Sequence, residues 1–383
     1  MDTPRGVAPF TNHLPVRVRF GAGAAVELGA IAPGRVLLVI DEGLEAHNPA
    51  VAEAVAALEA ASPVECFAKP PGEPDIDIVD RASAAVAATA PETIVALGGG
   101  SVIDTAKAAR ACAQQGVGYR DLGAIGEPAV SLVAVPTTAG TGSEVSGGAV
   151  VTDPATGRKA GIASPMLRAQ HAVVDPLLTH SVPADMTAQT GVDALAQAIA
   201  GMLARVRTPV GDAIALEAIR LIGRSLVPAF LDGEDAAARS EMACGSLLAG
   251  LTMNIADCTA EHSLGQAIGG MFHVPHGLTV GVVLVQTLER ERRLVPEQLE
   301  RVADALGVPA DGSADGSRAV HGVSDLLARL RFPVLRSLGV QETHVDALTD
   351  LALADPFHTV APEPWTEQEI RGAFLAALAE EAR

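Results

Sequence analysis

Asp193, His262 and His276 are of the residue types that hold divalent metal ions, and they come from three separate segments. Asp193 and Gln197 lie four residues apart in an Ala- and Leu-rich stretch with helical spacing, so both should leave one face of one helix. His262 lies in a second helical pattern, whereas His276 follows a proline in a predicted turn. Two imidazoles and a carboxylate can bind an ion such as Fe²⁺ and leave positions open for water or substrate. A second interpretation stays open on spacing alone: a surface carboxylate and two ordinary core histidines.

The composition is that of a globular protein and excludes several functions. The 383 residues, 49% of them hydrophobic, are enough for two domains with cores. A formal charge of −19 argues against nucleic-acid or anionic-membrane partners, because both would be repelled. The sequence has no CxxC pair, no signal-peptide pattern at its start and no apolar run near the roughly 20 residues of a membrane span. We therefore expect a cytoplasmic protein.

Alternating apolar runs and helical patterns in the first half predict an α/β domain with a doubly wound, mostly parallel sheet. The runs at 35–40 and 93–97 are almost unbroken, as in strands that are buried on both faces. Other strands are expected at 16–20, 64–68, 130–135, 150–153 and 172–175, with helices at 49–61, 76–88 and 102–113. We assign this domain to residues 1–180.

From about residue 181 only helical patterns follow, and they predict an all-α domain over 181–383. Helices are expected at 187–205, 210–226, 236–256, 260–269, 296–306, 317–330, 342–354 and 366–379. All the candidate metal ligands belong to this second domain.

Two loops at predicted strand ends favour a nucleotide ligand. Residues 98–101 (Gly-Gly-Gly-Ser) join a strand to a helix, so free backbone N–H groups and a helix N-terminus can face a pyrophosphate. A tight turn without a ligand is the alternative. Residues 137–143 form a second loop, rich in hydroxyls. Asp41, at an earlier strand end, can bind a ribose diol and would repel a 2′-phosphate, which favours NAD(H) over NADP(H), unless it only caps a helix.

Four motifs resemble the signatures of the iron-dependent (group III) alcohol dehydrogenase family, in the dehydroquinate synthase-like superfamily. They are Gly-Gly-Gly-Ser-Val-Ile-Asp-Thr-Ala-Lys at 98–107, Pro-Thr-Thr-Ala-Gly-Thr-Gly-Ser-Glu at 136–144, Gly-Val-Asp-Ala-Leu at 191–195 and Phe-His-Val-Pro-His-Gly at 272–277. The resemblance implies a dinucleotide-binding domain, a helical metal domain, a cleft between them and NAD(P)-linked chemistry.

The resemblance also assigns site residues. It implies cofactor contacts from Asp41, Gly99, Gly100, Ser101, Asp104, Thr137, Thr138, Thr141 and Lys159. It implies metal ligation by Asp193, Gln197, His262 and His276.

Two departures from the family concern the metal site. Gln197 stands where the family has a histidine ligand, and Gln266 stands where it has another active-site histidine. A glutamine oxygen is a weaker ligand for Fe²⁺ or Zn²⁺ than imidazole, so we expect a loosely held ion. His273 is the candidate proton donor, with a structural role near the cofactor as the alternative.

The resulting expectation is an NAD(P)H-dependent reductase of a small aldehyde or ketone that also runs as an alcohol dehydrogenase, in a homodimer. Hydride would pass to a metal-polarised carbonyl in the cleft between the domains, with NAD(H) favoured over NADP(H). Three alternatives stay open. They are a metal-independent reductase resembling maleylacetate reductases, a lyase resembling dehydroquinate synthases, and an inactive nucleotide-binding homologue.

Overall fold

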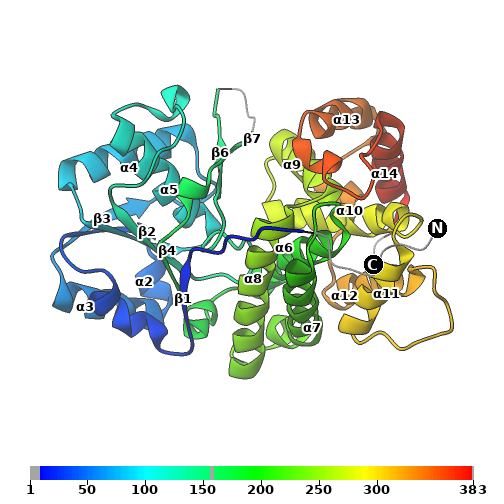
Figure 1. Cartoon of the computed structure of the whole chain (residues 1–383), viewed down its shortest axis with the longest axis horizontal. Helices are drawn as coiled ribbons and strands as arrows, with labels where there is room; N and C mark the ends of the chain where they lie inside the picture. The colour runs from blue at the N-terminus through cyan, green and yellow to red at the C-terminus, as the bar shows by residue number, and fades with distance from the viewer. Residues whose placement is uncertain (1–8, 156–158, 382–383) are drawn as a thin grey trace.

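The computed structural model describes residues 9–155 and 159–381, and it contains an α/β domain followed by a helical domain (Figure 1). The last strand of the sheet, β8 (His171–Val174), and the first long helix of the second domain, α6 (Ala184–Leu203), lie on either side of residue 180. The fold class expected from the sequence is confirmed.

Six strands form one sheet in the order β1-β8-β5-β4-β2-β3, and every neighbouring pair is parallel. The strands are β1 (Arg17–Phe20), β2 (Val36–Asp41), β3 (Val64–Lys69), β4 (Thr93–Gly98), β5 (Ser131–Pro136) and β8. Gly98 pairs with Pro136, so β4 and β5 end side by side. The two loops predicted to bind a nucleotide therefore leave the same edge of the sheet.

The apolar run of β2 explains why the sheet is covered on both faces. Val36, Leu38 and Ile40 pack on one face with α3 (Pro49–Ala61). Leu37 and Val39 pack on the other face with α4 (Ile76–Thr89) and α5 (Gly100–Gln115). Successive residues of a strand point to opposite faces, so a strand between two helical layers must be apolar throughout.

A short antiparallel hairpin stands apart from the main sheet. It consists of β6 (Gly148–Thr152) and β7 (Lys159–Ala163), of which only the first was predicted as a strand. Figure 1 shows the hairpin on the side of the α/β domain that faces the helical domain.

The helical domain is built around α6, whose residues from Gly191 to Leu203 are all buried. A helix that is apolar on all sides belongs in the centre of a domain. The helices around it are α7 (Pro209–Leu231), α8 (Ala236–Ala256), α9 (Ala260–Phe272), α10 (His276–Glu291), α11 (Pro296–Ala305), α12 (Ser317–Arg329), α13 (Val345–Leu353) and α14 (Glu367–Ala379). None of the helices in the described ranges is long and apolar enough to cross a membrane.

Helix α10 was not predicted, and it corrects the expectation that His276 lies in a turn. His276 is the first residue of α10, directly after Pro275 at the N-cap. Glycines and β-branched residues lower the intrinsic helix propensity of this segment, but burial against α6 and α9 outweighs propensity. Gly277 permits the approach to α6, because a Cβ there would lie 2.3 Å from the Gln189 carbonyl oxygen.

Candidate functional site

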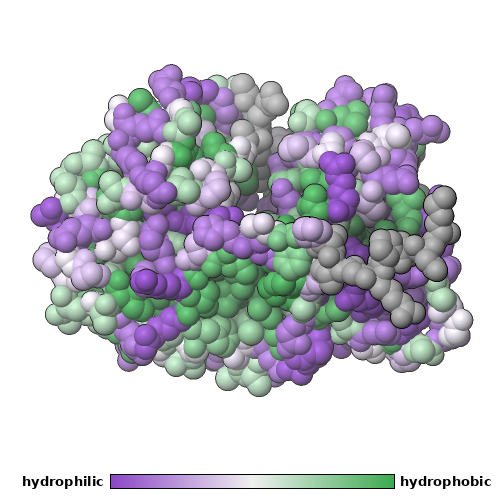
Figure 2. Space-filling view, in the orientation of Figure 1, coloured by the Kyte–Doolittle hydropathy of each residue, from purple (hydrophilic) through white to green (hydrophobic). Residues whose placement is uncertain are grey.

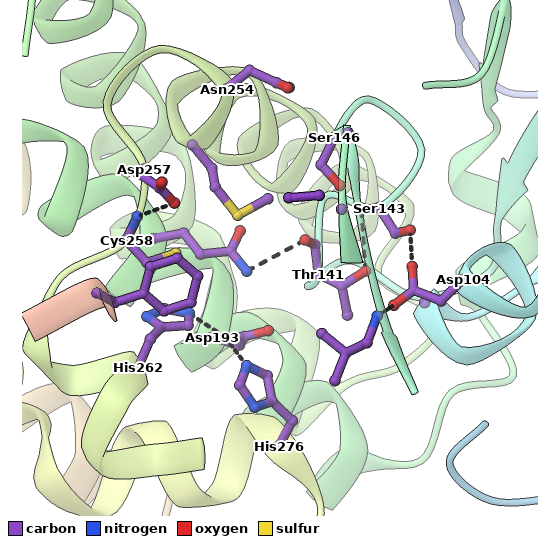
Figure 3. Close-up of a pocket in the computed structure, with 18 of the residues that line it drawn as sticks. Asp104, Thr141, Ser143, Ser146, Asp193, Asn254, Asp257, Cys258, His262 and His276 are labelled. Carbon is purple, nitrogen blue, oxygen red and sulfur yellow. Dashed lines mark hydrogen bonds and ion pairs between the residues drawn. The ribbon is translucent and has the colours of Figure 1, made fainter. Parts of the chain in front are cut away.

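A cavity of about 500 Å³ lies between the two domains. Figure 2 shows the molecular surface hollowed at this place. The glycine loop and the β6–β7 hairpin line the cavity from the first domain, and α6, α8, α9 and α10 line it from the second. Members of both groups of predicted site residues, the cofactor group and the metal group, therefore line one space (Figure 3).

Asp193, His262 and His276 meet at one end of this cavity, although α6, α9 and α10 supply one residue each. Asp193 Oδ1 lies 3.4 Å from His262 Nε2 and 3.8 Å from His276 Nε2. One nitrogen or oxygen atom from each residue lies within 4.8 Å of the other two. The three atoms can thus surround a single divalent ion.

The hydrogen bonds around His262 fit a cation at this point. Glu261, itself buried, accepts from His262 Nδ1 at 2.8 Å, so in the neutral ring Nε2 carries the lone pair and faces Asp193. Asp193 Oδ1 and His262 Nε2 are buried, and neither makes a hydrogen bond within the described ranges. Two acceptor atoms 3.4 Å apart require a proton or a metal ion between them.

The charges of the cluster point the same way. Burial opposes ionisation of Asp193, but His276, His262 and a hydrogen bond from Gln197 outweigh it and lower the pKa of the carboxyl. Burial likewise opposes a charged His262, but Cys258, Asp193 and Glu261 raise its pKa well above the ordinary value. The cluster is thus a strong proton site, and a divalent ion competes with protons for such ligands.

Gln197 is close to the cluster but presents its amide nitrogen. The nitrogen donates to the Thr141 carbonyl oxygen at 3.4 Å, and the Gln197 amide oxygen is buried without a hydrogen bond among the described residues. To coordinate a metal through oxygen, the amide would have to turn over and give up the Thr141 contact. Gln266 also lines the cavity.

The two nucleotide loops lie together at the other end of the cavity. Gly99 is the N-cap of α5, and the Thr137 amide donates to the Gly98 carbonyl oxygen at 3.0 Å. Gly100 approaches Thr141 so closely that a Cβ on it would lie 2.6 Å from the threonine side chain. The predicted cofactor residues that line the cavity are Gly100, Ser101, Asp104 and Thr141, whereas Gly99, Thr137 and Thr138 are not part of its lining.

Asp104 is occupied by protein partners. Its carboxylate accepts from the Ser143 hydroxyl at 2.5 Å and from the Val150 amide at 2.9 Å. Buried Lys107 lies 3.9 Å from Asp104 and donates to Ser143 at 2.9 Å. Burial lowers the pKa of Lys107 to about 8. This network holds α5, the hydroxyl-rich loop and β6 together, so Asp104 positions the second loop.

Asp41 does not line the cavity. Asp41 ends β2 and pairs at 3.3 Å with buried Lys69. Burial raises the pKa of Asp41, against the opposing charge of Lys69. The backbone of Lys159 begins β7, but its side chain lies outside the described part of the structure.

His273 lies at the C-cap of α9 in a left-handed conformation, with φ of 52°. Its side chain is exposed and is not part of the lining of the cavity. Its role as a proton donor stays a prediction.

Sequence reasoning missed several residues that shape the site. Glu261 orients His262, and its only signal in the sequence is that it precedes a candidate ligand. A contact between backbones was also missed: Gly142, with φ of +63°, packs against Gly250 of α8, and a Cβ on Gly142 would lie 2.4 Å from the Gly250 Cα. That contact brings the hydroxyl-rich loop against the helical domain.

Comparison with known proteins agrees with this geometry. The model of the family "Iron-containing alcohol dehydrogenase" matches residues 15–176, and that of "Fe-containing alcohol dehydrogenase family, C-terminal" matches residues 187–378. The chain is 34% identical to choline dehydrogenase of Bacillus subtilis (strain 168) over 90% of its length and 89% of the relative. It is 31% identical to NAD-dependent methanol dehydrogenase of Bacillus methanolicus over 96% of its length and 100% of the relative. The crystal structure of a 1,3-propanediol oxidoreductase superposes with a TM-score of 0.91 at 32% identity, covering 97% of this chain and 100% of that one. The chain is therefore an enzyme of the iron-containing alcohol dehydrogenase family.

Proposed function

We propose that the enzyme reduces a small aldehyde or ketone with NADH and catalyses the reverse oxidation of the alcohol. The observation that carries the proposal is the shared cavity, which joins the glycine loop at Gly100 to the cluster of Asp193, His262 and His276. Such a cavity brings a nicotinamide and a polarised carbonyl within reach of each other. NAD-dependence in the methanol dehydrogenase relative supports the choice of cofactor.

Each group of residues has a separate task in this reaction. The backbone N–H groups around Gly100 and the N-terminus of α5 would bind the pyrophosphate. Fe²⁺ or Zn²⁺ would be held by Asp193, His262 and His276. A bound ion would supply Lewis-acid polarisation of the carbonyl, and the nicotinamide would supply hydride. Glu261 keeps the His262 ring turned toward Asp193. The proton comes from water or His273, and the exposure of His273 favours water.

A metal-independent reductase resembling maleylacetate reductases is the second candidate. The observation in its favour is the replacement of two family histidines by Gln197 and Gln266. In that enzyme, His262 and His276 would donate hydrogen bonds to the substrate oxygen directly.

The metal decides between the two candidates. We expect one loosely bound divalent ion per chain, loss of aldehyde reduction on chelation, and recovery with Fe²⁺ or Zn²⁺. His276→Ala should lower turnover far more than NADH affinity, whereas His321→Ala, at an exposed position of α12, should change neither. Elemental analysis of anaerobically purified protein, paired with NADH absorbance, measures these effects. Full activity without transition metal would establish the metal-independent reductase.

The same titration resolves the part that Gln197 plays in metal binding. Gln197→His should tighten metal binding at least about tenfold, because imidazole is the stronger ligand. Gln197→Ala serves as the matched control. Unchanged metal affinity in Gln197→Ala would show that water occupies the fourth coordination position of the ion, beside Asp193, His262 and His276. Weakened affinity would show that Gln197 is the fourth ligand.

The glycine loop can be tested without disturbing the fold. A Cβ on Gly99 would meet Thr138 at 3.5 Å, an ordinary contact, so Gly99→Val should fold normally. The valine side chain would keep a pyrophosphate away from the backbone amides and should abolish NADH binding. Fluorescence titration with NADH measures the loss, and Gly126→Val, at an exposed loop glycine with open space around it, is the control. Wild-type affinity in folded Gly99→Val would refute the loop assignment.

Asp41 should set the preference for NADH over NADPH. Its carboxylate would bind a ribose diol and repel a 2′-phosphate, and Asp41→Ala should relax the preference. Steady-state kinetics with both cofactors measure the effect. Equal or better catalytic efficiency of the wild-type enzyme with NADPH would contradict the proposal.

We propose that two chains form a homodimer through the surface over β1. This edge strand exposes Val18 and Phe20, each 40% accessible, and Figure 2 shows a largely apolar surface between β1 and α8. An open strand edge beside apolar surface is a common site of association. Light scattering should give twice the mass of the chain, and Phe20→Lys should shift it toward the monomer. A wild-type monomer at micromolar concentration would exclude this assembly.

A further inference from the structure

Among the described residues that line the cavity, Arg168 is the one lysine or arginine. It follows the short 3-10 helix η3 (Pro165–Leu167), and its side chain is half-buried. Its Nε donates to Asn254 Oδ1 at 3.0 Å. Asn254 is itself fixed, because its amide nitrogen donates to the carbonyl oxygens of Val145 at 2.7 Å and Gly250 at 3.1 Å. The guanidinium is therefore held in a fixed position in the wall of the cavity.

The terminal nitrogens of Arg168 are available for a ligand. A guanidinium has five N–H donors, and within the described ranges only the Nε–H of Arg168 has an acceptor in the protein. No carboxylate in those ranges forms an ion pair with it, and burial lowers the pKa of Arg168 with no acid to offset the effect.

Arg110, which lies nearby, shows what a structural arginine looks like in this fold. Its two terminal nitrogens donate to four backbone carbonyl oxygens and one side-chain amide, among them the carbonyl of Arg168 at 3.2 Å. Arg110 thus ties η3 to α5 without any ligand. Arg168 has no comparable set of partners.

The position of Arg168 in the cavity suggests which end of a ligand it meets. In Figure 3, Asn254 lies across the cavity from Asp193 and His276. Arg168 is hydrogen-bonded to Asn254, so it belongs to the wall opposite the cluster of Asp193, His262 and His276, where the carbonyl oxygen would bind. Asp257, one of the acids that line the cavity, interacts with the charge of His262, and it forms no ion pair with Arg168 in the described ranges.

We propose that Arg168 recognises an anionic group, such as a carboxylate, sulfonate or phosphate, on the far end of the aldehyde or alcohol substrate. This inference rests on the proposed reductase function and adds the substrate class. A chain with a formal charge of −19 repels anions at long range, so binding an anionic substrate requires a dedicated cation. A planar, partly desolvated guanidinium can pair with two oxygens of such a group at once.

The test compares substrates of similar length and different charge. The measured quantity is the ratio of kcat/KM for succinic semialdehyde to kcat/KM for butanal, and it should exceed one for the wild-type enzyme. Arg168→Met should lower this ratio by about 10- to 100-fold, the usual effect of a charge-assisted hydrogen bond, and leave butanal reduction and NADH affinity unchanged. Arg168→Lys should restore part of the ratio. Arg220→Met, at an exposed position of α7, is the matched control. Sulfoacetaldehyde and a phosphorylated aldehyde then identify which anion is preferred.

Other results would overturn the inference. An unchanged ratio in Arg168→Met would make the residue structural. Equal losses for both aldehydes together with weaker NADH binding would assign it to the cofactor. A wild-type preference for betaine aldehyde would show that the cavity selects cations.

A binding measurement separates this inference from the proposed function. Calorimetry with 4-hydroxybutyrate needs no turnover, and Arg168→Met should abolish the heat of binding seen with wild-type protein. Binding that depends on Arg168 in a protein that reduces no aldehyde would refute the reductase and keep the anion site. Absence of both binding and turnover would refute both.

Discussion

The contact between Asp193 and His262 constrains the whole helical domain. Two buried acceptor atoms 3.4 Å apart, one of them on a carboxylate, are stable only with a positive charge between or beside them. The surrounding helices supply that environment, because the buried α6 carries Asp193, α9 carries His262 with its partner Glu261, and α10 adds His276. The packing of these helices thus offsets the free-energy cost of burying a carboxylate and two imidazoles at one point.

The two domains are joined at the same place. Gln197 donates to Thr141, and Gly142 packs against Gly250, so the hydroxyl-rich loop of the α/β domain lies directly on the helices of the metal cluster. Asp104, Lys107 and Ser143 then connect this loop to the helix that follows the glycine loop. A continuous set of hydrogen bonds and close contacts therefore runs from the nucleotide end of the cavity to the metal end.

The elements that sequence predicted best are those with strong local signals. Helix α3 begins at Pro49 after the N-cap Asn48, and α8 begins after the N-cap Asp235, and both match their predicted bounds. Helix α10 was missed because its glycines and β-branched residues contradict the helix that burial imposes. Strand β7 was missed because its pairing with β6 is a tertiary feature.

The site shows the same division between local and tertiary information. Asp193, His262 and His276 could be proposed from the sequence because they are metal-ligating residue types that stand in motifs resembling those of the family. The structure brings the three together. The orientation of the Gln197 amide depends on a carbonyl from the other domain, and the free donors of Arg168 depend on what surrounds it. Neither fact has a trace in the sequence.

The contact between Gly142 and Gly250 has a consequence for redesign of this enzyme. A Cβ on Gly250 would lie 2.7 Å from the Gly142 Cα, and one on Gly142 would lie 2.4 Å from the Gly250 Cα, so neither position tolerates a side chain even when the other is glycine. No compensating pair of substitutions exists, because both partners are already the smallest residue. Libraries that seek a new substrate range should therefore hold this pair constant and vary Met253 and Phe357, whose side chains line the cavity.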